Sequence, residues 1–158
     1  MPLLVGRYVN KIDRKGRVSV PKAFRDALVE QASGFVGIYA YPSFAVDAIE
    51  ACGEAFMQQL ADSIEDIAMF SDDQEDLTTT VLESAHQLPF DPEGRIVLPA
   101  DLLDHAGISG EAVFVGRGNN QFSIWNPATF SERQEKARVR ARANGATLVL
   151  RRKKEIPS

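Results

Sequence analysis

Residues 12–21 of the 158-residue chain read IDRKGRVSVP, and residues 90–99 read FDPEGRIVLP. The two stretches lie 78 residues apart and share an Asp, a Gly-Arg pair, a short apolar run and a closing Pro. The same offset pairs Phe44 with Phe122 without a gap, so it serves residues spread over more than thirty positions. A single offset over that length indicates an internal repeat rather than a chance match of one short motif.

Each copy is predicted to run strand, strand, helix, strand, strand. The turn between the first two strands is shaped by an Asp, whose carboxylate accepts hydrogen bonds from nearby backbone amides, and by a Gly with positive φ. These turn-shaping residues are Asp13, Gly16, Asp91 and Gly94. The last two strands are expected at 35–39 and 44–46 in the first copy and at 112–116 and 122–125 in the second. A unit of roughly 45 residues buries too little surface to stand alone, so the copies are expected to pair with each other.

The segment between the copies is predicted to be helical. Capping boxes begin at Asp47 and at Ser71. Apolar residues also recur on one helical face, namely Phe56, Leu60, Ile64 and Ile67. Helices are therefore expected at about 48–69 and 72–84.

The C-terminal segment is predicted to open with a helix at Pro127, capped by Asn126. Beyond Ala137 two interpretations are open. Either alternating arginines at 138, 140 and 142 form a strand with a turn at residues 144–145, or a long basic helix continues and ends at Gly145. A flexible basic tail is expected at 151–154. The predicted organisation is a first repeat at 5–50, an acidic helical connector at 51–82, a second repeat at 83–128, and a C-terminal helix with a basic tail at 129–158.

The charge of the chain is strongly segregated. The formal net charge of −4 and the pI near 5.2 would, taken whole, argue against a nucleic-acid partner. Residues 1–25, however, carry seven Lys or Arg and one Asp, and residues 26–94 carry fifteen acids and no Lys or Arg. Residues 95–158 carry eleven bases and six acids. The acidic total therefore does not exclude DNA, because the negative charge is concentrated in the middle of the chain.

The residue types exclude several classes of site. Cys52 is the only cysteine, so neither an intramolecular disulfide nor a cysteine metal cluster is expected. His86 and His105 lack partners at metal-ligand spacing, and no nucleophile motif is present. We therefore expect no metal, no cofactor, no small-molecule substrate and no enzymatic activity. The N-terminus lacks the apolar run of a signal peptide and no stretch suits a membrane span, so a cytoplasmic protein is expected.

The first turn is the strongest candidate for a binding site. Four cations fall within seven residues, where they repel one another unless an anion meets them: Lys11, Arg14, Lys15 and Arg17. Arg can grip phosphate or guanine with two parallel hydrogen bonds, and a two-stranded ribbon fits the major groove of DNA. Asp13 can also pair with Arg17 and position its guanidinium group.

A solvated surface hairpin is the alternative to a binding site, because short charge runs usually belong to the surface. The recurrence of Asp91-x-x-x-Arg95 at the same place favours a functional turn. Pro92 and Glu93 stand where the first turn has two cations, so the two turns are not equivalent. The turn of the first copy is therefore expected to be the main binding site.

These residues also carry a family resemblance. Residues 6–25, GRYVNKIDRKGRVSVPKAFR, and the second copy, with DPEGRIVLP at 91–99 and FSIW at 122–125, resemble the MraZ family of bacterial transcriptional regulators. That family belongs to the AbrB/SpoVT swapped-hairpin superfamily. The resemblance implies a β-rich α+β fold of two tandem ββαββ swapped-hairpin (AbrB-like) repeats that form an intrachain pseudo-dimer, with connecting and C-terminal helices.

The resemblance also implies a function. Proteins of this family form ring-like homo-oligomers and bind short direct repeats in double-stranded DNA, typically at the promoter of their own division and cell-wall gene cluster. Carried over by motif position, the DNA-contacting residues are Lys15 and Arg17, with Lys11 and Arg14 flanking them and Arg95 in the second motif. A regulator of this kind is expected in the cytoplasm, associated with the nucleoid. The acidic second turn and the basic segment after Arg133 depart from the shared motifs.

A protein-interaction module, such as an antitoxin of the same superfamily, is the alternative function. Such proteins combine DNA binding with a disordered tail that neutralises a toxin. The acidic stretch 47–84 has helical periodicity and caps, which argues for a folded element instead.

Overall fold

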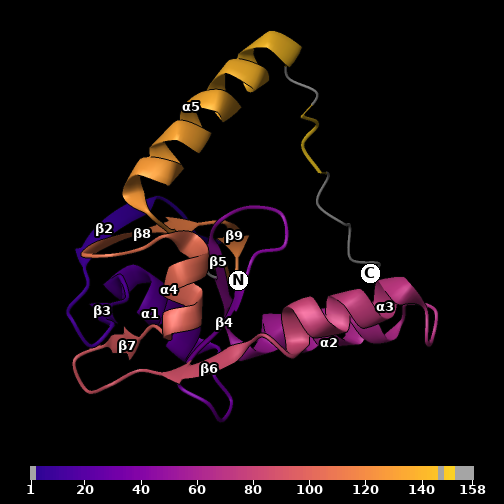
Figure 1. The fold of residues 1–158 in the computed structure, drawn as a ribbon, viewed down its shortest axis with the longest axis horizontal. Helices are drawn as coiled ribbons and strands as arrows, with labels where there is room; N and C mark the ends of the chain where they lie inside the picture. The colour runs from indigo at the N-terminus through magenta and orange to yellow at the C-terminus, as the bar shows by residue number, and fades with distance from the viewer. Residues whose placement is uncertain (1–2, 146–147, 152–158) are drawn as a thin grey trace, which may run out of the picture. The chain divides into compact units, whose positions relative to one another are not determined.

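The computed structural model describes residues 3–145 and 148–151, so of the predicted tail at 151–154 only Arg151 is described. The chain divides into two compact units, residues 1–127 and 128–158. All strands of the described ranges belong to the first unit, and the second contains most of one long helix (Figure 1).

The first unit is a strand-rich α+β body in which every described strand pairing is antiparallel. Its strands are β1 (Leu3–Leu4), β2 (Arg7–Lys11), β3 (Arg17–Ser19), β4 (Gly37–Pro42), β5 (Ile49–Cys52), β6 (His86–Pro89), β7 (Arg95–Val97), β8 (Glu111–Gly116), β9 (Gly118–Asn119) and β10 (Gln121–Trp125). Six of them form one sheet in the order β2-β8-β10-β5-β4-β6. Two further ribbons pair β1 with β9 and β3 with β7.

Strands of the two sequence copies pair with each other. The first strand of the first copy, β2, pairs with β8 of the second, and the first strand of the second copy, β6, pairs with β4 of the first. The short strands β3 and β7 pair with each other, and β5 pairs with β10. The expectation that the copies pair is confirmed by these four pairings, which stand beside the pairings of β4 with β5 and of β8 with β10 within a copy.

A helix follows the ribbon strand in each copy: α1 (Lys22–Glu30) and α4 (Ala100–Ala106). Pro21 and Pro99 stand at the N-caps, where a missing N–H is no loss, and their carbonyls accept hydrogen bonds from the first helical turn. Gly107 ends α4 with a left-handed φ of 63°. Both helices pack against β4 of the large sheet.

Alternation along β4 separates two hydrophobic cores, because successive side chains of a strand point to opposite faces. Ile38 and Ala40 belong to the main core, together with the apolar faces of α1 and α4. Tyr39 and Tyr41 belong to a second cluster, together with residues of α2 (Glu54–Glu65) such as Met57. Both faces of the sheet are therefore covered at β4.

The connector is helical but starts later than predicted. It consists of α2, α3 (Asp72–Leu77) and a π-helical turn, η1 (Thr78–Leu82). The Ser71 cap is confirmed, since its hydroxyl accepts from the Gln74 N–H at 3.1 Å. The helix predicted at 48–69 is wrong at its start, because β5 occupies 49–52 and Asp47 caps no helix.

Cys52 lies in β5 rather than in a helix. Burial raises the pKa of its thiol to about 12, so the thiol stays protonated. It packs in the second cluster with Tyr41.

The repeat offset of 78 residues fails after the first helix. β4 at 37–42 corresponds to β8 at 111–116, an offset of 74, so the first copy has four extra residues between its helix and its third strand. The strand predicted at 44–46 is wrong: residues 44–48 form a bend, and Phe44 is 70% exposed while Phe122 is fully buried. Insertions in surface connections are tolerated because they leave the strand pairings intact.

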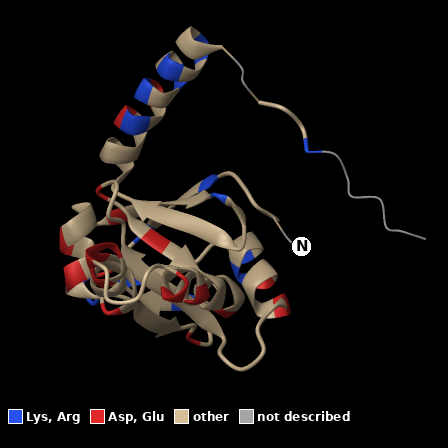
Figure 2. Cartoon of the chain, turned by 90° about the vertical axis from the view of Figure 1, so that its right-hand side faces the viewer, with Lys and Arg blue, Asp and Glu red and all other residues tan. Residues whose placement is uncertain are grey.

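The second unit contains most of α5 (Pro127–Asn144). Its start at Pro127 is as predicted, and Gly145 follows it with a φ of 68°. The long-helix interpretation is therefore confirmed and the strand interpretation is wrong. Figure 2 shows basic bands along this helix and acidic bands on the first unit.

Candidate nucleic-acid interface

The first Asp-x-x-x-Arg turn is organised by one carboxylate. Asp13 Oδ1 accepts from the backbone N–H groups of Lys15 and Arg17, both at 2.9 Å, and Oδ2 accepts from Arg17 Nε at 2.6 Å. The Asp13 carbonyl accepts from the Gly16 N–H at 3.0 Å. A single aspartate therefore closes the loop and holds the arginine side chain.

The second turn repeats these bonds residue by residue. Asp91 Oδ1 accepts from the N–H groups of Glu93 at 2.9 Å and Arg95 at 2.8 Å, and Oδ2 accepts from Arg95 Nε at 2.8 Å. The Gly94 N–H donates to the Asp91 carbonyl at 2.9 Å. Asp and Gly thus have the same structural part in both turns.

Each turn is anchored on the other copy. The Leu98 N–H donates to the Gly16 carbonyl at 2.8 Å, and the Val20 N–H donates to the Gly94 carbonyl at 3.2 Å. The two glycines have φ of 82° and 80°, in the left-handed region that favours glycine. These hydrogen bonds between the copies hold the two turns against the ends of the ribbon formed by β3 and β7. Neither turn therefore depends on its own copy alone.

The ribbon of β3 and β7 has an inner and an outer face. Val18 and Ile96 pair at its centre, and each is only 1% exposed. The alternate positions lie on the outer face: Arg17, Ser19, Arg95 and Val97. Both motif arginines therefore lie on the outer face of a short two-stranded ribbon.

The two arginines differ in what they can still bind. Arg17 Nε is held by Asp13, and no residue in the described ranges accepts a hydrogen bond from the terminal nitrogens of Arg17. Arg95 Nε is held by Asp91, but its Nη2 also lies 3.4 Å from Glu93 Oε2. The terminal guanidinium nitrogens of Arg17, its fork, are available to an external anion. The fork of Arg95 is instead shared with an acid of its own turn.

Hydrogen bonding stabilises the ionised form of both aspartates. The Arg17 backbone N–H is the main cause that lowers the pKa of Asp13 below its ordinary 3.8, and the Arg95 N–H does the same for Asp91. The side-chain hydrogen bond to Asp91 raises the pKa of the Arg95 guanidinium. Both aspartates therefore stay ionised at neutral pH.

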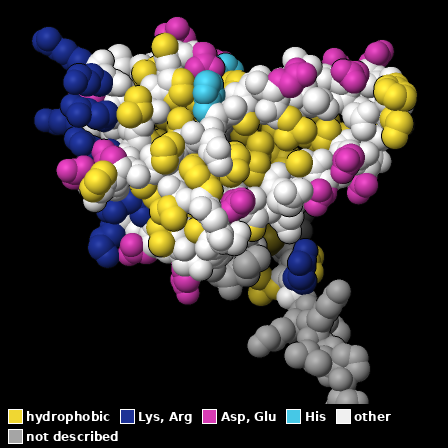
Figure 3. All heavy atoms as spheres, turned by 90° about the horizontal axis from the view of Figure 1, so that it is seen from below, with side chains coloured by type: hydrophobic (Ala, Val, Ile, Leu, Met, Phe, Trp, Pro, Cys, Tyr) yellow, Lys and Arg dark blue, Asp and Glu magenta, His cyan; other side chains and the backbone are white. Residues whose placement is uncertain are grey.

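The other predicted site residues surround the first turn. Lys11 ends β2, Arg14 and Lys15 form the tip of the turn, and all three are exposed. Lys and Arg side chains gather at the left edge of Figure 3, over the end that carries the turns before β3 and β7. The structure thus brings the predicted cations together on one end of the first unit.

Arg25 is a cation of this surface that the motif did not identify. It lies on α1, its Nε donates to the Val20 carbonyl at 3.0 Å, and a Cβ on Gly94 would clash with its guanidinium group. The guanidinium therefore lies against the second turn. The repeat contained a signal for it, because the equivalent position in the second copy is Leu103, an apolar residue packed against the core.

We expect the double variant Asp13→Asn/Asp91→Asn to be less stable than wild type at neutral pH and to approach it in acid. Folding lowers both pKa values, so the stabilising contribution is present above about pH 4 and is lost as the pH falls through the folded-state values. Urea unfolding of both proteins at fixed concentration, from neutral pH to about pH 2.5, measures this difference.

The control for this comparison is Glu30→Gln/Glu65→Gln, which removes two exposed acids outside the turns and should follow the wild-type profile. A stability difference between the aspartate variant and wild type that stays constant across the pH range would contradict the role assigned to these carboxylates.

Comparisons with known proteins place the chain in a family. A family model described as "MraZ protein, putative antitoxin-like" matches residues 81–152. A protein of Pelagibacter ubique (strain HTCC1062) named "Transcriptional regulator MraZ" is 41% identical over 146 residues, 92% of this chain and 92% of that protein. The chain belongs to the MraZ family.

Two further MraZ relatives cover almost the whole chain. The "Transcriptional regulator MraZ" of Rickettsia bellii (strain OSU 85-389) is 40% identical over 149 residues, 94% of this chain and 97% of that protein. The protein of the same name from Rickettsia felis (strain ATCC VR-1525 / URRWXCal2) is 39% identical over 148 residues, with the same coverage. Matches of this extent span both Asp-x-x-x-Arg turns, so the MraZ resemblance of the motifs is confirmed at the scale of the chain.

The described part of the chain contains no cluster of three or more residues suited to hold a metal ion. It also contains no helix that is both long and apolar enough to cross a membrane.

Proposed function

We propose that the protein is a sequence-specific DNA-binding transcriptional regulator that contacts DNA through its first turn. The observation that carries the proposal is the Arg17 guanidinium, which Asp13 holds by Nε while its terminal nitrogens point to no acceptor among the described residues. The names of the MraZ relatives support regulation of transcription. The proposed contact residues are Lys11, Arg14, Lys15 and Arg17, with Arg95 in a lesser part.

The chemistry of the turn suits DNA. A guanidinium that is already held along one edge loses little side-chain freedom when it grips guanine or phosphate with the other. The exposed lysines supply point charges for backbone phosphates, and the two-stranded ribbon has a width that the major groove admits. In the proposed complex, Arg17 reads a base and the neighbouring cations fix the register.

The proposed fold is a pair of tandem AbrB-like swapped hairpins, with repeats at 5–50 and 83–128, a connector at 51–82 and a C-terminal segment at 129–158. The pairing of β2 with β8 and of β6 with β4 supports a pseudo-dimer made by one chain. The ends of the two anchored turns then form one DNA-binding surface.

We also infer that the protein assembles into a ring-like homo-oligomer. The acidic connector has no Lys or Arg, and Met69 and Phe70 at its tip are 75% and 84% exposed. These two neighbouring side chains offer an apolar contact to a second copy. A monomeric mass by light scattering at moderate salt would contradict the assembly.

The proposed target is a set of short direct repeats in the promoter of the protein's own division and cell-wall gene cluster, on nucleoid DNA in the cytoplasm. Footprinting of the purified protein on the DNA upstream of its own gene tests this. We expect protection of regularly spaced short sites that weakens steeply with salt. Equal protection of the upstream fragment and a shuffled fragment would contradict sequence-specific regulation.

An antitoxin-like interaction module is the second candidate, favoured by the wording of the family description. The acidic segment that such a module would use to bind a toxin is folded into α2 and α3 here, and it packs on the second cluster. Co-purification of a small toxic partner from the native host would favour this candidate over the first.

A further inference from the structure

α5 is a helix with no hydrophobic face. None of its residues is buried, and every residue from 135 to 145 is exposed. Its first half mixes acids with bases, whereas the second half, from Lys136 to Asn144, carries four cations and no acid: Lys136, Arg138, Arg140 and Arg142. The helix therefore presents concentrated positive charge to solvent within the described part of its unit.

The cations of α5 are only partly compensated. Lys136 lies 3.2 Å from Glu132, and Arg138 lies 3.5 Å from Glu135, while Arg140 and Arg142 have no acidic partner among the described residues. Lys136 and Arg140 are four residues apart on one side of the helix, and Arg138 and Arg142 on another. Like charges at this spacing destabilise a helix. The C-terminal helix dipole favours a cation only in the last turn, so it accounts for Arg142 and not for the others.

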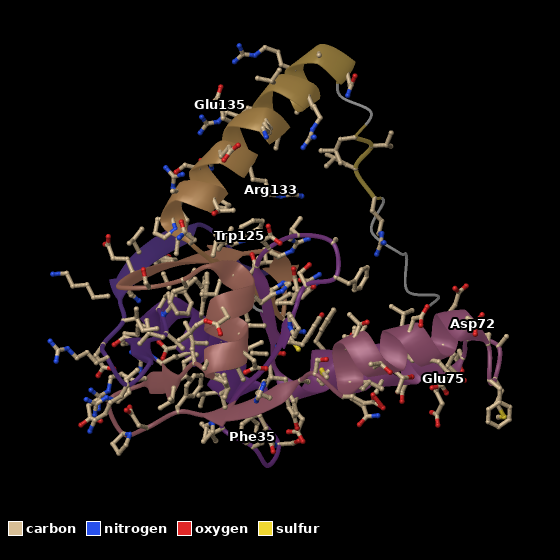
Figure 4. The ribbon with its side chains drawn as sticks, viewed as in Figure 1. Phe35, Asp72, Glu75, Trp125, Arg133 and Glu135 are labelled. Atoms are coloured by element: carbon tan, nitrogen blue, oxygen red, sulfur yellow. The ribbon has the colours of Figure 1, made fainter. Side chains whose placement is uncertain are left out.

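The cations project in different directions. Two residues apart on a helix means about 200° of rotation, and the labelled side chains of Arg133 and Glu135 accordingly lie on opposite sides of α5 (Figure 4). Charge that surrounds a helix suits a partner whose own charge is extended rather than confined to one side chain.

Two polyanionic partners are available to such a helix: the acidic connector of a second copy and the DNA backbone. A protein interface needs an apolar core in which charged residues are depleted. Between residues 131 and 144, α5 offers Val139 as its one apolar side chain larger than Ala, and that side chain is 59% exposed. Phosphate binding, by contrast, needs cations alone. The composition therefore favours DNA.

We propose that α5 is a second, sequence-independent DNA-binding element, which contacts backbone phosphates through Arg140 and Arg142. The inference rests on the proposed function, because the first turn brings the same DNA to the chain and raises the phosphate concentration that α5 encounters. The first turn discriminates between sequences, and α5 adds affinity to all of them.

The test compares two double variants with wild type on a duplex from the protected upstream region and on a scrambled duplex of equal length. Arg140→Gln/Arg142→Gln removes both charges but keeps residues of similar helix propensity. Arg140→Lys/Arg142→Lys is the matched control, because lysine keeps the positive charge on which salt-dependent phosphate binding depends. Binding constants are measured at several KCl concentrations.

We expect the Gln pair to weaken binding to both duplexes by a similar factor. The slope of log affinity against log salt should fall in magnitude by about 1.8 per bound protomer, at about 0.9 for each lost phosphate contact. The ratio between the two duplexes should not change, and the Lys pair should bind like wild type. This combination supports phosphate binding by α5.

Three results would overturn the inference while leaving the proposed function intact: wild-type affinity and slope for the Gln pair, equal losses for the Gln and Lys pairs, or a change of oligomeric mass without a change of slope. The last of these would place α5 on a second copy. If wild type binds neither duplex, the proposed function fails, and the inference about α5 fails with it.

Discussion

Arg17→Ala is expected to weaken binding to the operator, meaning the proposed DNA site upstream of the protein's own gene, by roughly tenfold to a hundredfold. Affinity for scrambled DNA should stay nearly unchanged. The reason is that a good bidentate contact between arginine and a base discriminates by about 1–3 kcal/mol, and the Arg17 fork is the one that its own turn leaves available. Titration of both duplexes at one salt concentration measures the ratio of affinities.

Arg95→Ala is the matched control for this result. It removes an arginine from the equivalent position of the same ribbon face, but Glu93 already shares that guanidinium. The loss of preference should therefore be clearly smaller than for Arg17→Ala. Circular dichroism and oligomeric mass should match wild type for both variants. If Arg17→Ala bound the operator as well as wild type, or if Arg95→Ala had the larger effect, the proposal that Arg17 of the first turn recognises the DNA sequence would be wrong.

Phe122→Ala is expected to cost about 3–5 kcal/mol of unfolding free energy, the usual range for a large aromatic side chain in a core. Phe122 is fully buried in β10, and its ring lies 5.2 Å from that of Phe24 and 6.0 Å from that of Phe114, measured between centroids. Removing the ring would leave a cavity between the sheet and α1 that neighbouring aromatic side chains fill only partly.

Phe44→Ala provides the contrast, because a constant repeat offset makes Phe44 the equivalent of Phe122. Phe44 is 70% exposed in the bend before β5, so its truncation should change stability by less than about 0.5 kcal/mol. Urea unfolding of both variants at one protein concentration makes the comparison. Equal costs for the two substitutions would contradict the strand register of the first copy.

The two turns were predictable because their structure is local. Asp13 and Gly16 interact within five residues, and the same residue types recur at 91 and 94, so sequence pattern and hydrogen bonding agree. The later strands of the first copy were not predictable in the same way. The four extra residues before β4 do not stand out in the amino-acid composition. Only the pairing of β4 with β6 reveals where the 78-residue offset between the copies changes.

The inequality of the two turns was only half visible in the sequence. Glu93 in place of Lys15 predicts a weaker second site, but the contact of Glu93 with Arg95 depends on side-chain geometry. Arg25 illustrates a larger gap, since it reaches Gly94 from a helix of the other copy. Contacts between residues nearly seventy positions apart follow from the pairing of strands between the two copies and not from any local pattern.

The sequence by itself determined that the chain carries two related copies with Asp-x-x-x-Arg turns, an acidic middle and a basic end, because composition, spacing and turn chemistry are local properties. Only the tertiary structure decided which strands pair, that Phe44 lies outside the core while Phe122 lies within it, and that the Arg17 fork is available while that of Arg95 is shared. The physical reason is that burial and hydrogen bonding between distant segments depend on the path of the chain through space, and that path changes with a few residues in a loop.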